Sequence, residues 1–225
     1  MYSDILGAEP TWVRCADCQI ETMMTRCRSC EDSRLERALY ADKMAAAERA
    51  IPNEFAWARL GCSELAKRVR LAPSRSFEST VKTILAAKNV TLVGQAGSGK
   101  TSLLVACLRE VLPGGLFVTS DELAHAGIRS KAGAGEPQLI RDACRVGTLL
   151  IDEVKGAHAA PHYSLTAVIE HRWNHDMPTW ITTGMQRNAL VEAFGEGIDR
   201  RLFGERNFAL RLMPRELTAV REIAA

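Results

Sequence analysis

The stretch VTLVGQAGSGKT, residues 90–101, decides the fold of this chain. Its apolar start predicts a buried strand at Val90–Val93, and a helix is predicted over Lys100–Val111. Between them, residues 94–101 match the pattern G-x-x-x-x-G-K-[ST]. The glycines of such a turn let backbone N–H groups point inward around a phosphate, and the helix N-terminus adds partial positive charge. The stretch therefore predicts a phosphate-binding loop (P-loop) in an α/β domain.

Two side chains of this loop have separate expected roles. Lys100 is expected to reach the β- and γ-phosphate oxygens, and the Thr101 hydroxyl is expected to ligate Mg²⁺. A glycine-rich turn that matches by chance is the alternative, but the flanking strand and helix argue against it. The residues expected to bind the nucleotide are Gly94, Gln95, Ala96, Gly97, Ser98, Gly99, Lys100, Thr101 and Ser102.

Short apolar runs recur on both sides of helix-length segments in the rest of the chain. They lie at 116–119, 148–151, 179–183 and 208–212. This alternation is typical of a parallel sheet covered by helices on both faces. We therefore expect a doubly wound α/β domain with a parallel five-stranded sheet.

Two acidic residues, Asp152 and Glu153, follow the apolar run Leu149–Leu150–Ile151. A buried parallel strand would carry Asp152 to its C-terminal end beside the P-loop, where the carboxylate can hold Mg²⁺ through water. Glu153 can polarise an attacking water, which favours hydrolysis of the nucleotide. Two solvated acids at the end of a strand are the alternative interpretation.

The order of these motifs resembles that of a known family. The P-loop, LLIDE at 149–153, a strand ending in Thr-Thr at 182–183 and a late DRRL at 199–202 together are similar to the AAA+ ATPases of the DnaC/IstB type. That family comprises bacterial replicative helicase loaders and transposition helper ATPases. The segment IPNEF at 51–55 also resembles the start of the family's ATPase core. The resemblance covers roughly residues 51–213 and implies an AAA+ domain without a C-terminal helical lid.

The resemblance also implies roles for three further side chains. Thr183 would lie at the tip of the sensor strand, although Gly184 replaces the asparagine that usually follows in this family. Arg201, or else its neighbour Arg200, would be an arginine finger offered to the ATP of an adjacent subunit. The protein would then assemble with itself through the ATP site. A solvated or ion-paired helix face is the alternative for both arginines.

Four of the seven cysteines lie close together as two C-x-x-C pairs. Four thiolates at this spacing suit tetrahedral Zn²⁺, and the metal would supply folding energy to a module too small for a core. A redox pair or free surface thiols are the alternatives. The expected zinc ligands are Cys15, Cys18, Cys27 and Cys30.

The cysteine module precedes a predicted helix at 33–50, and we expect residues 1–50 to form a unit separate from an ATPase domain at 51–225. Arginines around the module, with Trp12, can contact single-stranded DNA phosphates. Interspersed acids fit a mixed solvated face equally well. Docking of a partner protein is the preferred use of the module, and the resemblance implies that this partner is a replicative ring helicase.

The composition sets limits on these interpretations. The chain has 225 residues, 47% of them hydrophobic and 25% charged, and a net charge of +2, which excludes a disordered protein and a global attraction to nucleic acid. Neither a secretion signal nor an apolar run of membrane-spanning length is apparent. We therefore expect a soluble, cytoplasmic protein without a membrane partner.

Together these patterns predict a zinc-bearing ATPase that acts as a helicase loader in DNA replication. It would bind MgATP, single-stranded DNA and a ring helicase, and would hydrolyse ATP. A transposition helper ATPase is the nearest alternative. A P-loop small-molecule kinase and an adaptor that binds ATP without hydrolysing it are alternatives from other classes.

Overall fold

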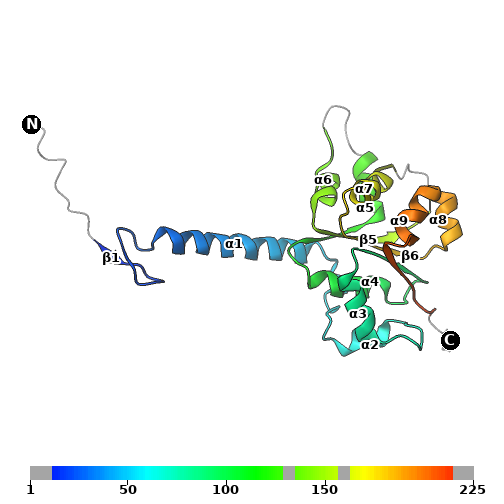
Figure 1. Cartoon of the computed structure of the whole chain (residues 1–225), viewed down its shortest axis with the longest axis horizontal. Helices are drawn as coiled ribbons and strands as arrows, with labels where there is room; N and C mark the ends of the chain where they lie inside the picture. Colours follow the sequence, from blue (N-terminus) through cyan, green and yellow to red (C-terminus); the bar gives the residue numbers. More distant parts are fainter. Residues whose placement is uncertain (1–11, 129–134, 157–162, 215–225) are drawn as a thin grey trace, which may run out of the picture. The chain divides into compact units, whose positions relative to one another are not determined.

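A computed structural model describes residues 12–128, 135–156 and 163–214 of the chain. The chain divides into two compact units, Met1–Ala46 and Ala47–Ala225 (Figure 1). In the described ranges, no helix combines the length and the apolar character needed to cross a membrane.

The first unit contains a small hairpin and most of a long helix. Strands β1 (Val13–Arg14) and β2 (Glu21–Thr22) pair antiparallel, and α1 spans Arg28–Arg49. The helix begins before the predicted residue 33, because the Glu31 N–H already donates to the Cys27 carbonyl at 3.0 Å. The second cysteine pair therefore forms the first helical turn. None of the residues of α1, all of which the structure describes, is buried.

The second unit is built on a five-stranded parallel sheet, as predicted. The strand order is β4-β5-β6-β3-β7, and each described neighbour pair is parallel. The chain runs from β3 to one edge of the sheet, returns through β5 and β6, and crosses to the other edge, so a switch point lies beside β3. The strands are β3 (Asn89–Val93), β4 (Gly115–Thr119), β5 (Thr148–Val154), β6 (Thr179–Thr183) and β7 (Asn207–Arg211).

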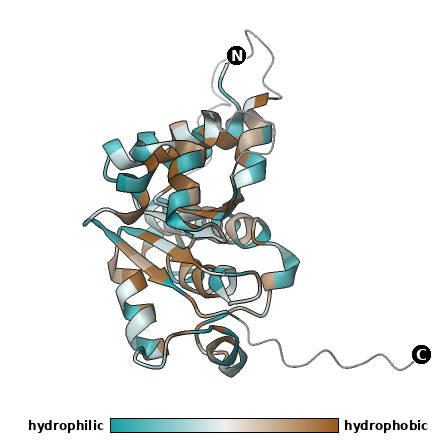
Figure 2. Ribbon diagram, turned by 90° about the vertical axis from the view of Figure 1, so that its right-hand side faces the viewer, coloured by the Kyte–Doolittle hydropathy of each residue, from teal (hydrophilic) through white to brown (hydrophobic). Residues whose placement is uncertain are grey.

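Helices cover both faces of the sheet, with α3 and α4 on one side and α5, α6 and α7 on the other (Figure 1). Figure 2 shows helices that carry both hydrophilic and hydrophobic residues, as amphipathic helices packed on a sheet do. The described helices that follow β3 in the chain are α4 (Lys100–Arg109), α5 (Ser120–Ile128), α6 (Gln138–Arg145), α7 (Tyr163–Asn174), α8 (Arg187–Phe194) and α9 (Glu196–Phe203).

Alternation along the strands divides the apolar residues between two cores. Leu150 and Trp180 pack with α3 (Phe77–Ala86) and α4 in one cluster. Ile151 and Ile181, one residue further along β5 and β6, pack in the other cluster with residues of α5 to α9. The part of the chain that the structure describes ends at Pro214, three residues after β7.

The connector between α1 and α3 is more ordered than its sequence indicates. It forms a short 3-10 helix, η1 (Asn53–Phe55), and the helix α2 (Ser63–Arg68). Ile51, Ala58 and Leu65 of this connector are buried in the core beneath α4. The spacing of apolar residues in this connector could not predict these elements, because the apolar residues pack against strands and helices that are far away in the sequence.

A buried arginine, Arg172 of α7, joins several segments on the face of the sheet opposite α4. The Arg172 guanidinium is fully buried and donates to the carbonyls of Ala143, Val146, Gly147 and Pro178. It also donates to the Thr179 hydroxyl at 3.0 Å. Burial lowers the pKa of Arg172 to about 10. The five contacts satisfy the desolvated cation and fix the start of β5 against that of β6.

Candidate functional site

The P-loop connects β3 to α4 at the C-terminal end of the sheet. Gly97 and Gly99 adopt φ values of +75° and +89°, a region that glycine enters without steric cost. Gly99 is also closely packed: a Cβ there would lie 2.9 Å from the Arg68 carbonyl oxygen and 2.9 Å from the Val69 Cα. A glycine at this position therefore lets the loop turn against the segment that follows α2.

Lys100 lies on the inner side of this loop and is 9% exposed. Its Nζ donates to the carbonyls of Gly94 at 2.7 Å and Gln95 at 3.0 Å. Burial lowers the pKa of Lys100, and the negative charges of Asp152 and Glu153 oppose this shift. The ammonium group is thus held where loop backbone, helix N-terminus and strand-end carboxylates converge.

Asp152 brings two hydroxyl groups together at the end of β5. Its Oδ1 accepts hydrogen bonds from Thr101 Oγ1 at 2.7 Å and from Thr182 Oγ1 at 2.6 Å. Carboxylate and hydroxyl oxygens are hard donors of the kind that Mg²⁺ prefers. Thr101 and Asp152 therefore fit the metal role expected of them, and they lie beside the Lys100 cation.

Glu153 occupies a bulge in β5. The β5–β6 register shifts between Ile151 and Val154, and Glu153 has φ +56°, which is uncommon for a residue with a side chain. Its N–H donates to Thr182 Oγ1 at 2.9 Å, and its carbonyl accepts from Ser120 Oγ at 2.7 Å. The carboxylate is left largely exposed and lies 3.3 Å from Lys155 Nζ.

A cavity of about 330 Å³ lies over these residues. A second cavity of about 460 Å³ adjoins the other side of the P-loop, lined by three residues of the first together with Glu64, Lys67, Arg68 and Arg70. Together the two cavities surround the turn from Gly97 to Ser102. The first is lined by Phe55, Ala96, Gly97, Gly99, Lys100, Thr101, Ser102, Asp152, Glu153, Thr182 and Gly184.

The structure separates the two threonines at the end of β6. Thr183 is fully buried, and its hydroxyl donates to the Val154 carbonyl at 2.7 Å and accepts from the Met185 N–H at 3.0 Å. It is not among the residues that line the cavity, whereas Thr182 and Gly184 are. The hydroxyl at the site belongs to Thr182, whereas the sequence had led us to expect Thr183 there. All five residues of β6 are buried, so the sequence pattern gives no signal that distinguishes Thr182 from Thr183.

The two arginines of α9 also differ. The Arg201 side chain is 17% exposed and forms an ion pair with Glu170. Arg200 is exposed and lines an open hollow of about 580 Å³ with residues of α8, including Arg187. Neither is among the described residues that line the two cavities at the P-loop. The predicted finger residues thus lie away from the P-loop of their own chain.

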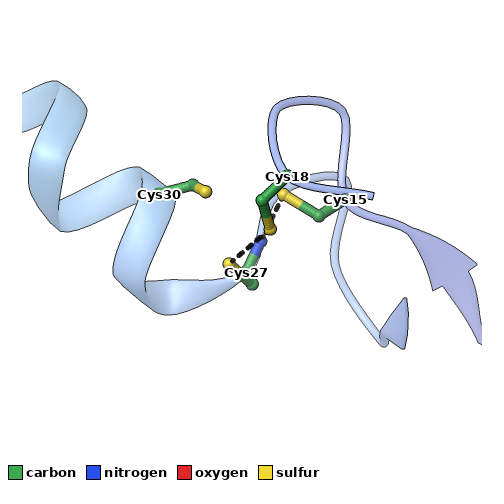
Figure 3. A group of neighbouring side chains, drawn as sticks. All are labelled: Cys15, Cys18, Cys27 and Cys30. Carbon is green, nitrogen blue, oxygen red and sulfur yellow. Dashed lines mark hydrogen bonds between the residues drawn. The ribbon is translucent and has the colours of Figure 1, made fainter. Parts of the chain in front are cut away.

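The four cysteines form a cluster in the first unit. Their sulfur atoms all lie within 4.8 Å of one another. Cys15 and Cys18 come from the turn of the hairpin, Cys27 directly precedes α1, and Cys30 lies in the first turn of α1; all four side chains converge (Figure 3). The separation between Cys18 Sγ and Cys27 Sγ is 3.6 Å. Four convergent thiols at these distances fit a tetrahedral Zn²⁺ site.

Local hydrogen bonds favour a thiolate in this cluster. Backbone N–H groups of Cys18, Cys27 and Asp17 lower the pKa of the Cys15 thiol to about 6. Hydrogen bonds with the side chains of Cys18 and Cys27 raise the pKa of Cys30 to about 12. Accumulating four thiolates requires a compensating cation, which Zn²⁺ would provide.

No known family model matches the sequence, and no curated protein is detectably similar to it. Solved structures do resemble the fold. DnaI matches with TM-score 0.57 and 19% identity over 72% of this chain and 95% of that chain. A putative primosome component from Streptococcus pyogenes serotype M3 matches with TM-score 0.54 and 19% identity, over 77% of this chain and 99% of that one. A DnaC helicase loader matches with TM-score 0.50 and 18% identity, over 68% and 100%.

At these identities the likeness concerns the fold alone. The second unit shares its fold with the DnaI and DnaC helicase loader structures, and a four-cysteine cluster precedes this fold in the sequence.

Proposed function

We propose that this protein is an ATP-dependent helicase loader that binds MgATP, single-stranded DNA and a replicative ring helicase. One observation carries the proposal: Lys100, Thr101 and Asp152 converge at the P-loop, with Glu153 beside them. This arrangement occurs in a fold shared with structures named DnaI and DnaC helicase loader. Asp152 and Glu153 together favour hydrolysis, because one acid can hold a metal while the other activates water.

In this proposal the P-loop backbone binds the phosphates, and Lys100 donates to the β- and γ-phosphate oxygens. Thr101 and Asp152 would hold Mg²⁺, and the bound metal would neutralise charge on the phosphates. Glu153 lines the same cavity and orients the attacking water while accepting its proton. The protein residues act mainly by positioning and by electrostatic stabilisation.

We assign the arginine finger to Arg200. A finger has to leave its own subunit and reach a neighbour's phosphates, and Arg200 is exposed. Arg201 is mostly buried and paired with Glu170, so its release would break an ion pair. An arginine finger accelerates hydrolysis by about 10³-fold to 10⁵-fold in GTPases. ATP turnover by this protein would therefore depend on self-assembly through the ATP site.

The first unit is the proposed docking element. Zn²⁺ held by the four cysteines would fix the hairpin to the start of α1, in a reducing compartment such as the cytoplasm. Leu35, Leu39 and Tyr40 of α1 are each more than half exposed, and exposed apolar side chains on one helix favour a protein partner. In the proposed function this partner is the ring helicase.

The test is ATP hydrolysis by the zinc-loaded protein, alone, with single-stranded DNA, and with the replicative helicase of the same genome. We expect stimulation by DNA or helicase and transfer of the helicase onto circular single-stranded DNA. Lys100→Ala controls for contaminating activity. Hydrolysis without any helicase transfer would contradict the loader, and phosphate transfer to a small molecule would indicate a kinase.

A further inference from the structure

Thr182 connects the two acidic residues of the site through one hydroxyl group. The hydroxyl donates to Asp152 Oδ1 at 2.6 Å and accepts from the Glu153 N–H at 2.9 Å. We propose that Thr182 is a positioning residue that orients the Asp152 carboxylate for Mg²⁺ and holds Glu153 in its bulge. The inference rests on the proposed nucleotide site and adds a residue to it.

The direction of both hydrogen bonds follows from chemistry. A backbone N–H only donates, so the Thr182 oxygen has to accept from Glu153. The single hydroxyl hydrogen is then free to point at Asp152, which as an ionised carboxylate only accepts. A side chain without a hydroxyl would lose both contacts at once, and serine would retain both.

Asp152 is oriented by two donors on the same atom. Thr101 Oγ1 also donates to Oδ1, at 2.7 Å, and among the described residues no side chain donates to Oδ2. The hydroxyls of Thr101 and Thr182 therefore fix the carboxylate plane from two elements, α4 and β6. The other oxygen is left to face a metal or its bound water, and contacts of this kind tune metal affinity in other proteins.

Glu153 needs support of its own, because its φ of +56° is unfavourable for a residue with a Cβ. The regular β5–β6 pairing is interrupted between Ile151 and Val154. At this interruption the Thr182 hydroxyl binds the Glu153 N–H, and Ser120 Oγ binds the Glu153 carbonyl at 2.7 Å. Side chains thus replace the missing ladder contacts and hold the Glu153 peptide from both ends.

The test compares Thr182→Val with Thr182→Ser and with Thr91→Val. Thr182→Val keeps the side-chain shape but removes the hydroxyl. Thr91 is a matched control: it is a buried threonine on the adjacent strand β3, paired in register with Ile181. Its hydroxyl donates to the Leu202 carbonyl of α9, away from the nucleotide site. Thr91→Val therefore loses one buried hydrogen bond without touching Asp152 or Glu153.

The primary readout is the Mg²⁺ dependence of binding to a fluorescent ATP analogue. We expect Thr182→Val to raise the Mg²⁺ concentration needed for half-maximal binding by about 10-fold to 100-fold, the range found for residues that orient metal ligands. Binding without Mg²⁺ should stay within about twofold of wild type, because the P-loop is unchanged. Thr182→Ser should restore the Mg²⁺ dependence, and Thr91→Val should not alter it.

The Mg²⁺ dependence of nucleotide binding tests the role of Thr182, whereas ATP hydrolysis tests the proposed function, so the two can fail separately. A Thr182→Val protein with wild-type Mg²⁺ dependence, or with the same response as Thr91→Val, would overturn the positioning role even if wild type hydrolyses ATP. Wild-type binding that does not depend on Mg²⁺ would overturn it as well. A wild type that binds MgATP but never hydrolyses it would refute the ATPase, while a shift in Thr182→Val would still support the positioning role.

Discussion

Two P-loop glycines with the same type of backbone conformation should respond differently to alanine. Gly97 and Gly99 both have positive φ, so alanine at either position costs about 1 to 2 kcal/mol of stability. A Cβ on Gly97 meets no atom within 4 Å, whereas one on Gly99 meets the Arg68 carbonyl oxygen and Val69 Cα, each at 2.9 Å. Overpacking adds about 1 to 3 kcal/mol. We expect losses of about 1 to 2 kcal/mol for Gly97→Ala and about 2 to 5 kcal/mol for Gly99→Ala.

The steric cost at Gly99 is difficult to relieve because the opposing backbone is held in place. The Arg70 N–H donates to the Ser98 carbonyl at 3.1 Å, and the Arg70 carbonyl accepts from the Met213 N–H at 2.7 Å. Urea unfolding without nucleotide measures the two free energies of unfolding, so that ligand contacts do not enter. Equal losses for Gly97→Ala and Gly99→Ala would refute the packing argument.

Three further predictions concern catalysis, assembly and metal. Glu153→Gln should bind ATP but lower single-turnover hydrolysis by about 10² to 10⁴, and near-normal hydrolysis would place the water-activating group elsewhere. Mixing Arg200→Ala with Lys100→Ala should restore ATPase activity, because intact sites form between unlike subunits; restoration with Arg201→Ala instead would reverse our assignment. Elemental analysis should find about one zinc per chain, lost in Cys27→Ser together with the circular dichroism of the first unit; a folded metal-free unit would contradict the zinc site.

The strands of the sheet could be predicted closely because each is a short apolar run between helix-length segments. The predicted strand at 179–183 has the bounds observed for β6, and β3 differs from its prediction only by starting at Asn89. Helix α2 was not predicted. Its single buried residue, Leu65, shows no period within six residues and packs in a core formed by distant parts of the chain.

The residues of the candidate site could be predicted from the sequence to different degrees. The P-loop is contiguous in sequence, so its pattern alone indicated Lys100 and Thr101. Asp152 could be proposed because parallel strands end at one edge of a sheet. Choosing between Thr182 and Thr183 required the face on which each side chain lies, and choosing between Arg200 and Arg201 required the position of Glu170. Both choices depend on contacts between segments far apart in the chain.

The sequence by itself determined the strand, loop and helix of the P-loop, the alternation that makes a parallel sheet, and the paired cysteines. These follow from periodicity and from residues within one turn of each other, where the chain's own geometry sets the outcome. Only the tertiary structure decided that Thr182 joins Asp152 to Glu153, and that Arg201 is held while Arg200 is exposed. Such contacts arise when packing brings distant segments together, and local periodicity carries no information about them.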